Sequence, residues 1–385
     1  MAELGRWTQA ARGGLDTDTG RGAVVPPIYL STNYTFLAPG EPREHDYSRS
    51  GNPTRDVLND ALATLEGGAG GVSVTSGMAA VTLVVEALVP VGGRIVAPHD
   101  AYGGTWRLFT MLADTGRIRV DFVNLTKHDD AARALDEPTD LLWVETPSNP
   151  LLRITDIAAT AKLAHAVGAK VAVDNTFCSP LLQQPIAHGA DIVVHSTTKF
   201  IAGHSDVVGG AVIASDAGDH ETLVHWANAL GLTGSAFDSY LTMRGLRSLD
   251  ARLRVHAENA EALVDVFDGH PAVMALHYPG LPDHPDFELA RRQMSGHGSI
   301  ITVELVGGRD AVSHFLDGLQ IFHLAESLGG TESLICHPAT MTHAAMSAAA
   351  QSAAGIGEGT LRLSVGLEGR DDLIAVISEA LERVG

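Results

Sequence analysis

Short apolar segments alternate with helix-like segments between residues 55 and 215, and this alternation restricts the possible folds more than any other feature. Strands joined by helices usually run parallel, because the helix carries the chain back across the sheet before the next strand begins. The sequence therefore predicts an α/β fold with a large, mostly parallel sheet of seven strands. The expected strands are residues 72–74, 94–97, 120–123, 141–145, 170–174, 192–195 and 210–214.

One of the intervening helices is clearly delimited by its end residues. Asp156 can cap its N-terminus, and Gly168 can end it. Between them Ile157, Ala161 and Ala164 recur at helical spacing and would form one apolar stripe. The sequence thus predicts a helix that returns the chain across the sheet to the next strand.

The regions on either side of this alternating pattern divide the chain into three predicted parts. Residues 1–50 are rich in Gly, Pro, Thr and Asp and lack periodicity, so we expect an extended N-terminal arm with little core. Residues 51–245 would form the large α/β domain, with one long connecting helix over residues 216–250. Residues 246–385 would form a smaller C-terminal α/β domain. Its expected elements are half-buried, alternating strands at 299–306 and 361–366 and helices at 258–267 and 371–384.

The composition argues against several classes of protein. The chain has 385 residues, 45% hydrophobic and 19% charged, which is typical of a globular protein with more than one core. Its net charge is −20 and it has no basic stretch, which argues against nucleic acid as a partner. No apolar run is long enough to cross a membrane, and the first residues lack a signal-peptide pattern. We therefore expect a cytoplasmic protein.

Cysteine and histidine usage indicates neither a disulfide framework nor a metal site. Cys178 and Cys336 are the only cysteines, as expected in a reducing compartment. The 18 histidines show no HExxH motif and no paired Cys/His spacing, so we expect no metal. A dinucleotide cofactor is also not expected, since no GxGxxG motif follows the first strand.

Lys199 lies shortly after the apolar strand predicted at 192–195. Burial near a strand end removes hydration from an ammonium group, which lowers its pKa and makes the amine a nucleophile toward aldehydes. A lysine that extends its amine into solvent is the alternative at such a position. The neighbouring hydroxyls of Ser196 and Thr198 favour an aldehyde that bears a phosphate. We therefore hypothesise a Schiff base between Lys199 and pyridoxal phosphate.

Ser76 and Asp174 also lie at the carboxyl ends of predicted strands, where α/β sheets bind their ligands. With Gly77 and Met78, Ser76 opens a helix whose first N–H groups could bind a phosphate, although turns of this kind often bind nothing. Asp174 could pair with a protonated pyridine nitrogen. A helix cap or a salt bridge is the alternative role for that carboxylate.

Three further segments carry candidate side chains. Tyr102 precedes two glycines and could stack on a flat ligand, or it could be an ordinary core tyrosine. Arg362 lies within the alternating segment 361–365, where it could face solvent or bind a substrate carboxylate. Tyr47 and Arg49 lie in a turn-rich segment that, taken alone, indicates a surface loop.

Together these segments resemble one family over nearly the whole chain: the Cys/Met-metabolism enzymes among the fold-type I pyridoxal phosphate proteins. Within it the chain is most similar to the members that replace a group at the substrate's Cγ. The resemblance is carried by His45-Asp-Tyr-Ser-Arg49, Gly51-Asn-Pro-Thr-Arg55, Ser76-Gly-Met78, Tyr102-Gly-Gly-Thr-Trp-Arg-Leu-Phe109, Glu145-Thr-Pro-Ser-Asn-Pro-Leu-Leu152, Val173-Asp-Asn-Thr-Phe177, the run from His195 to Asp206, Gly234-Ser-Ala-Phe-Asp-Ser-Tyr240, Arg244-Gly-Leu-Arg247 and Leu324-Ala-Glu-Ser-Leu-Gly-Gly330.

The resemblance implies pyridoxal 5′-phosphate as the cofactor and assigns residues to it. Lys199 would bind its aldehyde, Asp174 would pair with its ring nitrogen, and Tyr102 would stack on its ring; these three would be the catalytic residues. The family's assembly is a homotetramer of two active-site dimers. The phosphate would therefore be bound by Ser76, Gly77, Met78, Ser196 and Thr198 of one subunit and by Tyr47 and Arg49 of its neighbour.

The resemblance also implies a transferase that acts on an O-acylated homoserine. An O-succinyl or O-acetyl group would leave Cγ, and a thiol, foremost cysteine, would add there to give cystathionine in methionine biosynthesis. Asn149, Ser327 and Arg362 would lie at the amino-acid end of the substrate, with Arg362 on the α-carboxylate.

Three more positions would select the donor and the thiol, namely Asp46, Ser50 and Glu326. Bacterial synthases of this family often have a second arginine where Ser50 stands, which could bind the distal carboxylate of O-succinylhomoserine. Because that arginine is absent here, O-acetylhomoserine and O-phosphohomoserine are also possible donors. Cystathionine γ-lyases share Glu326, which leaves γ-elimination as an alternative, together with replacement by another nucleophile in specialised metabolism. Gly104 stands where methionine γ-lyases carry a cysteine, which counts against that subclass.

Overall fold

The computed structural model describes residues 4–384, which divide into two compact units. The first unit comprises Lys170–Asp250 together with the chain up to Pro90. The second comprises Val91–Ala169 together with the chain from Ala251 onward. The three-part division at residues 50 and 245 stays a prediction.

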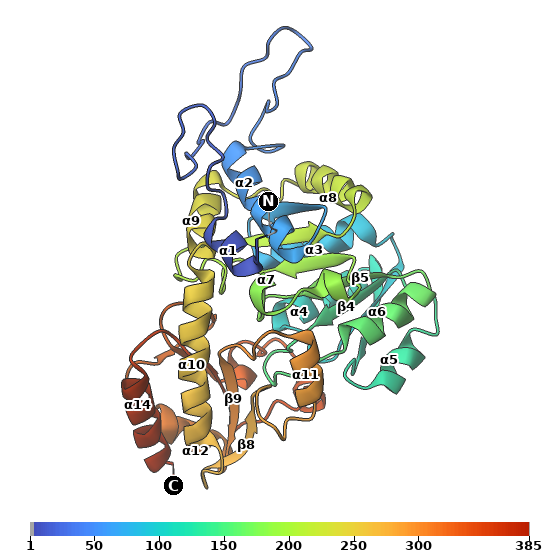
Figure 1. Cartoon of the computed structure of the whole chain (residues 1–385). Coiled ribbons are helices and arrows are strands. Elements are labelled where there is room, and N and C mark those ends of the chain that lie inside the picture. The colour runs from blue at the N-terminus through green and yellow to red at the C-terminus, as the bar shows by residue number, and fades with distance from the viewer. Residues whose placement is uncertain (1–3, 385) are drawn as a thin grey trace. The chain divides into compact units, whose positions relative to one another are not determined.

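The strands and helices of the described chain follow the alternating order that the sequence predicts (Figure 1). The strands are β1 (Gly70–Val74), β2 (Gly93–Pro98), β3 (Ile118–Val123), β4 (Leu141–Glu145), β5 (Lys170–Asp174), β6 (Ile192–His195), β7 (Gly210–Ala214), β8 (Val273–His277), β9 (Ile300–Leu305), β10 (His323–Leu324), β11 (Leu334–Cys336) and β12 (Thr360–Ser364). The α-helices are α1 (Arg6–Ala11), α2 (Pro53–Glu66), α3 (Gly77–Leu88), α4 (Gly103–Asp114), α5 (His128–Ala134), α6 (Ile157–Ala166), α7 (Ser179–Leu182), α8 (Ala217–Leu230), α9 (Ala236–Leu246), α10 (Leu249–Phe267), α11 (Phe287–Gln293), α12 (Gly308–Leu316), α13 (Ala348–Ala354) and α14 (Arg370–Glu382). Short 3-10 turns lie at η1 (Pro185–His188) and η2 (Pro338–Thr340).

The larger sheet has seven strands in the order β1-β7-β6-β5-β4-β2-β3, which confirms the predicted α/β class and strand number. In the first unit β5 and β6 are parallel, and in the second unit β2 is parallel to both β3 and β4. β7 runs antiparallel to β6 and β1. The reason is that residues 196–209, which join β6 to β7, contain no helix to carry the chain back across the sheet.

The predicted helix caps have the expected geometry. The Asp156 carboxylate accepts a hydrogen bond from the Ala159 N–H at 2.9 Å at the start of α6, and Gly168 follows the helix with a φ of +79°. In the first unit α2 begins in the same way, since Asn52 accepts from the N–H groups of Thr54 and Arg55. These caps fix where each helix begins relative to the neighbouring strand.

Residues 216–250 do not form the single connecting helix that the sequence predicts. α8 ends at Gly231, which adopts a left-handed φ of +70°, and α9 begins only after Ser235 caps it by accepting from the Asp238 N–H. A left-handed glycine ends a helix because its conformation turns the chain away from the helix axis. The N-terminal arm also differs from the prediction, because it contains the short helix α1. Figure 1 shows the rest of the arm as an open loop before α2.

The second unit contains a five-stranded sheet in the order β10-β11-β12-β9-β8, as expected for the C-terminal α/β region. Leu263 of α10, Phe315 of α12 and Ile377 of α14 share one buried cluster with Val303 of β9 and Leu363 of β12. Figure 1 shows α10 as a long helix, and both α10 and α14 contribute side chains to this cluster.

The prediction that the two central strands of this sheet are half-buried is wrong. Every residue of β12 is buried, and β9 is buried except at Glu304. Two of their buried polar residues bind acceptors inside the protein: Thr302 donates to the carbonyl of Pro150 at 2.6 Å, and Arg362 donates to two oxygen acceptors. The alternating pattern therefore reflects buried polar groups with partners, not a solvent-exposed face.

Candidate functional site

The N-terminus of α3 in the first unit forms a tight turn that is suited to an anion. Ser76 caps the helix, and its Oγ accepts from the Ala79 N–H at 3.1 Å. The N–H groups of Gly77 and Met78 lie in the first helical turn, where no preceding helical carbonyl can accept from them. A Cβ on Gly77 would lie 2.7 Å from the Cβ of Ser196, so only glycine permits this close approach. The helix dipole and the first N–H groups favour negative charge here.

The segment from Ser196 to Lys199 leaves β6 as a compact loop. The Ser196 N–H donates to Thr176 Oγ1 at 2.8 Å, and the Lys199 N–H donates to the Ser196 carbonyl at 3.2 Å. Thr198 Oγ1 accepts from the Gly209 N–H at 3.0 Å and lies 3.1 Å from the Gly209 carbonyl, to which it can donate. Lys199 is half-buried. These bonds hold the two predicted phosphate hydroxyls and the predicted nucleophile on one short loop at the end of a strand.

Asp174 ends β5, the strand next to β6 in the first unit. One of its carboxylate oxygens accepts from the Thr176 N–H at 3.0 Å. Burial raises the pKa of Asp174, while the hydrogen bonds from Thr176 and the nearby His195 act in the opposite direction. A carboxylate that burial disfavours gains most from a cationic partner. That is the property which pairing with a protonated ring nitrogen requires.

A buried polar cluster ties the ends of these two strands to α2. His195 and Glu66 have no exposed side-chain surface, and His195 Nε2 donates to Glu66 Oε1 at 2.6 Å. The Asn175 amide donates to the same oxygen at 2.8 Å. Thus the residue after Asp174 and the residue before Ser196 share one acceptor. No local sequence pattern connects Glu66 with His195, so its role is visible only in the folded chain.

Tyr102 in the second unit occupies the position before the first residue of α4, and its side chain is 40% exposed. Its N–H donates to Glu145 Oε2 at 2.7 Å, and the indole N–H of Trp143 donates to Glu145 Oε1 at 3.1 Å. Burial raises the pKa of Tyr102, and the charge of Glu326 raises it further, whereas Arg107 lowers it. The phenol therefore keeps its proton at neutral pH.

Arg362 lies on β12 in the second unit and is 3% exposed. Its Nη1 donates to Asn149 Oδ1 at 2.8 Å, and its Nη2 donates to the Ser327 carbonyl at 2.8 Å. Ser327 has a φ of +89°, a left-handed conformation that is rare outside glycine and often marks a functional site. Arg362 Nε is buried with no hydrogen-bond partner among the described residues. This guanidinium can donate further hydrogen bonds to a carboxylate.

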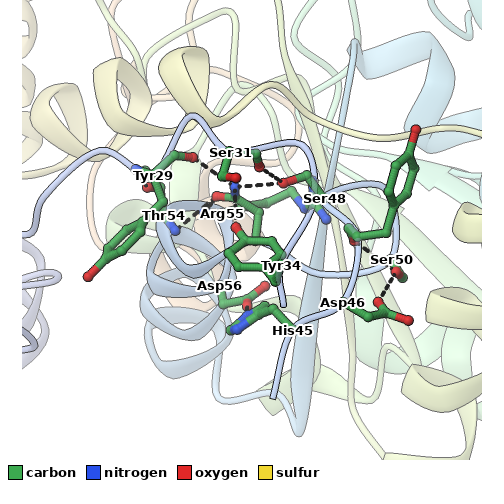
Figure 2. Close-up of polar contacts among 12 residues, drawn as sticks. Tyr29, Ser31, Tyr34, His45, Asp46, Ser48, Ser50, Thr54, Arg55 and Asp56 are labelled. Atoms are coloured by element: carbon green, nitrogen blue, oxygen red, sulfur yellow. Dashed lines mark hydrogen bonds and ion pairs between the residues drawn. The ribbon is translucent and has the colours of Figure 1, made fainter. Parts of the chain in front are cut away.

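The predicted residues of the arm lie on the segment that precedes α2. The Ser50 hydroxyl donates to Asp46 Oδ1 at 3.0 Å, as Figure 2 shows. Tyr47 and Arg49 are exposed, and the Arg49 guanidinium donates to the carbonyl and side-chain oxygens of Asn228 at 2.8 and 2.6 Å. Both line a cavity of about 460 Å³ in the first unit.

The arm is fastened to the start of α2 by polar contacts. His45 Nε2 lies 2.8 Å from a carboxylate oxygen of Asp56, the Tyr29 N–H donates to the Thr54 hydroxyl at 2.9 Å, and Ser48 contacts Ser31 (Figure 2). The segment that sequence analysis alone indicated to be a surface loop is thus an exposed loop with a defined anchor.

Each unit therefore collects a distinct set of the predicted residues. The first holds Asp46, Tyr47, Arg49, Ser50, Ser76, Gly77, Met78, Asp174, Ser196, Thr198 and Lys199. The second holds Tyr102, Asn149, Glu326, Ser327 and Arg362. Two residues of these sites were not predicted from the sequence: Glu145, which binds the Tyr102 N–H, and Thr176, which binds Asp174. Glu145 carried a signal that could have found it, since it is a charged residue at the end of a buried strand.

The residues of the first unit fit pyridoxal phosphate. The closely packed turn at Gly77, the hydroxyls of Ser196 and Thr198, a buried strand-end carboxylate and a half-buried lysine provide the donor set for a phosphate, a pyridinium and an aldehyde.

Comparison with known proteins decides the family. The sequence pattern of the family described as Cys/Met metabolism PLP-dependent enzyme matches residues 7–382. The chain belongs to this family. Its pyridoxal phosphate dependence and enzyme class are those that the sequence motifs indicated, and the fold is that of the fold-type I enzymes.

Individual relatives of the family agree over nearly the full length. Cystathionine γ-synthase of Escherichia coli is 52% identical over 96% of this chain and 95% of its own. Cystathionine γ-lyase of Dictyostelium discoideum is 42% identical over 98% and 97% of the two chains. Structures of cystathionine γ-synthase from Xanthomonas oryzae pv. oryzae superpose with a TM-score of 0.98 and 56% identity, covering 100% of this chain and 99% of theirs. The predicted similarity is confirmed at the level of the cystathionine γ-synthases.

Two further findings concern the described part of the chain. No helix within residues 4–384 is both long and apolar enough to span a membrane. Those residues also contain no group of three or more His, Cys, Asp or Glu side chains placed to bind a metal ion.

Proposed function

We propose that this enzyme replaces the acyl-oxy group at Cγ of an O-acylated homoserine with a thiol. The donor is O-succinyl- or O-acetylhomoserine, and the thiol is cysteine. The products are cystathionine and the free carboxylic acid, so that the proton of the thiol balances the acyl-oxy group that leaves. This reaction is a transsulfuration step toward methionine.

The similarity to the Xanthomonas oryzae enzyme carries this proposal. One structure of that protein is a complex with aminoacrylate and cysteine, and another is a complex with cystathionine. A protein that binds cysteine and cystathionine has room for both the attacking thiol and the thioether product. The identity of 56% over the whole chain supports the same use here.

The proposed role of the first unit is to hold the cofactor and move protons. When bound, pyridoxal phosphate supplies an electron-withdrawing ring that stabilises negative charge at the substrate's Cα. The Gly77 and Met78 N–H groups, with the hydroxyls of Ser196 and Thr198, would hold its phosphate. Asp174 would keep the ring nitrogen protonated. Lys199 Nζ would take the proton from Cα and then move protons at Cβ.

The proposed role of the second unit is to orient the amino acid. Arg362 would hold the α-carboxylate, and Asn149 and Ser327 fix the guanidinium by accepting two of its hydrogen bonds. Tyr102 would stack on the ring with its hydroxyl protonated, because its pKa is raised. Glu326 would face the distal part of the substrate.

We also propose a cytoplasmic homotetramer in which Tyr47 and Arg49 bind the cofactor phosphate of the neighbouring subunit. Both side chains are exposed, and the arm that carries them is anchored at α2. In this arrangement Asp46 and Ser50 would lie beside the incoming donor, and together with Glu326 they would select the leaving acyl group.

A γ-elimination of the cystathionine γ-lyase type is the second candidate, because lyases of the family cover almost the whole chain at 42% identity. Elimination would release ammonia and a 2-oxo acid from the intermediate to which a synthase adds a thiol. The two reactions therefore differ in their products.

A product assay with the purified holoenzyme distinguishes these functions. O-Succinyl- and O-acetylhomoserine are each supplied with and without cysteine, and cystathionine and 2-oxobutanoate are quantified. Cystathionine should dominate whenever cysteine is present. If 2-oxobutanoate dominates even at saturating cysteine, the proposed replacement reaction is wrong and the lyase assignment holds.

The proposed bond to Lys199 is tested by borohydride reduction followed by peptide mass analysis. The wild-type peptide that contains Lys199 should carry the reduced cofactor. Lys199→Ala should bind pyridoxal phosphate without covalent attachment and should lose at least about 1,000-fold in kcat, the scale expected when a proton-transferring group is removed. Substantial turnover by Lys199→Ala contradicts the role given to its amine.

A further inference from the structure

His343 lies in the second unit, on the loop that follows η2, and its side chain has no exposed surface. Its Nε2 lies 3.0 Å from the carbonyl oxygen of Asn149, and its Nδ1 lies 2.9 Å from the hydroxyl of Thr342. No motif in the sequence gave this histidine a role in the reaction. Its position beside Asn149 connects it to Arg362.

The two contacts define the tautomer of the ring. The Asn149 carbonyl can only accept, so Nε2 must carry the proton and donate it. Burial, and then the charge of Arg362, lower the pKa of His343 to about 4, so the ring is neutral at working pH. Nδ1 then has a free lone pair and accepts from the Thr342 hydroxyl. The result is a series of hydrogen bonds in which Thr342 donates to His343 and His343 donates to Asn149.

This series of hydrogen bonds continues to the guanidinium of Arg362. Asn149 presents its carbonyl to His343 and its side-chain oxygen to Arg362 Nη1 at 2.8 Å. Arg362 is buried and leaves Nε without a partner among the described residues. The direction in which its remaining donors point depends on where Asn149 holds it.

The backbone around His343 is itself rigidly held. Its N–H donates to the Pro338 carbonyl at 3.0 Å, and its carbonyl accepts from the Gln351 amide at 2.9 Å. A Cβ on Gly103 would lie 2.4 Å from the Thr342 carbonyl oxygen, so the start of α4 packs directly against this dipeptide. The ring is therefore attached to a fixed support, as a positioning group requires.

We propose that His343 is a positioning residue that holds Asn149, and through it Arg362, in the geometry that binds the substrate's α-carboxylate. The proposal rests on the proposed function only in taking Arg362 as the carboxylate clamp. Loss of the Nε2–H donor would free Asn149 and weaken the binding of α-amino carboxylates. Binding of the cofactor phosphate, which the proposed function gives to residues of the first unit, would not change.

The test uses two ligands that differ only in the carboxylate. L-2-Aminobutyrate carries the α-carboxylate, and 1-aminopropane is the same amine without it; neither has a leaving group. Their dissociation constants are measured calorimetrically with the holoenzyme. His343→Met should weaken L-2-aminobutyrate about tenfold, the loss expected for one buried hydrogen bond, and leave 1-aminopropane unchanged.

Conservative variants separate positioning from mere structure. His343→Gln keeps a donor at the Nε2 position, so its affinity for L-2-aminobutyrate should stay within about twofold of the wild type. Thr342→Val removes the hydroxyl that donates to Nδ1 and should cause an intermediate loss. His256→Asn is the matched control, because His256 is equally buried, has a pKa lowered to about 4 and bonds to the Val365 carbonyl.

Three outcomes would overturn the proposal. The first is an unchanged affinity for L-2-aminobutyrate in His343→Met or in Thr342→Val. The second is an equal loss of that affinity in His343→Met and His343→Gln, and the third is an equal weakening of L-2-aminobutyrate and 1-aminopropane binding. If His343→Met fails to fold, Thr342→Val and His343→Gln still decide. A wild-type enzyme that binds L-2-aminobutyrate but converts no O-acylhomoserine would refute the proposed function and leave this inference intact.

Discussion

Glu66 and His195 are 129 positions apart in the sequence, yet they form a hydrogen-bonded pair at 2.6 Å with neither side chain exposed. The same carboxylate oxygen accepts from Asn175 at 2.8 Å. Asn175 follows Asp174 and His195 precedes Ser196, so one glutamate of α2 holds the ends of the two strands that carry the predicted ring partner and the predicted lysine loop.

Removing this acceptor should destabilise the protein strongly. Glu66→Leu leaves the buried His195 Nε2–H without its acceptor and removes one acceptor of the Asn175 amide, which keeps the Gln183 carbonyl. We expect the free energy of unfolding to fall by about 3 kcal/mol. Denaturant titration of the variant and the wild type measures the loss. Glu379→Leu is the control, because Glu379 pairs with Arg383 at the surface with 73% of its side chain exposed, and its loss should stay below about 1 kcal/mol. Equal effects of the two substitutions would contradict the importance of the buried acceptor.

The buried histidines should make the protein sensitive to mild acid. The pKa values of His256 and His343 are lowered to about 4 in the folded chain, whereas the unperturbed value is 6.5. Below pH 6.5 the unfolded chain binds these protons and the folded chain does not, so stability falls as the pH falls toward 4. Between pH 7 and pH 5 each histidine should remove about 2 kcal/mol from the free energy of unfolding.

Unfolding titrations at several pH values test this expectation. The double variant His256→Asn with His343→Gln keeps one donor at each site and removes both titrating rings. Its stability should therefore depend much less on pH in this window. If the wild type is equally stable at pH 7 and pH 5, the two rings do not titrate in the way their burial implies.

Replacing Asp174 should affect both cofactor binding and turnover. Asp174→Asn keeps the size of the side chain but not its negative charge, so the proposed partner of a protonated ring nitrogen is lost. We expect weaker binding of pyridoxal phosphate and a fall in kcat/KM of about 100-fold, similar to the loss of other charge-stabilising groups. An absorbance titration of the apoenzyme measures the first effect. Asp216→Asn, at the exposed cap of α8, should leave both unchanged, since asparagine caps as well as aspartate does.

Tyr102→Phe should lower kcat/KM about tenfold, and this factor should be the same at every pH between 7 and 9. The phenol of Tyr102 has a raised pKa and is protonated throughout this range, so the variant loses the same hydroxyl at each pH while keeping the ring. Parallel pH–rate profiles check this. Tyr278→Phe removes a tyrosine hydroxyl that donates to the Gly298 carbonyl, and should leave the rate unaltered. A ratio of wild-type to variant rates that changes steadily toward pH 9 would mean that Tyr102 ionises in the working range.

The strands of the large sheet were predictable because runs of apolar residues and helix caps are local signals. β4 through β7 have the predicted bounds, and Asp156 caps α6 as expected. The prediction of one long helix over residues 216–250 failed because a left-handed glycine, Gly231, interrupts it. The prediction of half-buried strands failed because an alternating pattern shows which residues are polar, not which are exposed. Thr302 and Arg362 are polar residues whose partners lie elsewhere in the second unit.

The residues of the candidate site also differ in whether a local sequence pattern could reveal them. Lys199, Asp174 and Ser76 could be found because each lies at or shortly after the carboxyl end of a buried strand, a position that the local pattern reveals. Glu66 and His343 could not, since their roles depend on partners 129 and 194 positions away. Such contacts depend on how the elements pack against one another.

The sequence by itself determined the α/β class, the family and the residues able to bind a cofactor, because apolar periodicity, helix caps and side-chain chemistry are local properties. Only the tertiary structure decided which groups support them: the Glu66 carboxylate under two strand ends, and the neutral His343 ring behind Asn149 and Arg362. The physical reason is burial. Away from water each polar group must find a partner in the folded chain, and packing alone determines which partner is within reach.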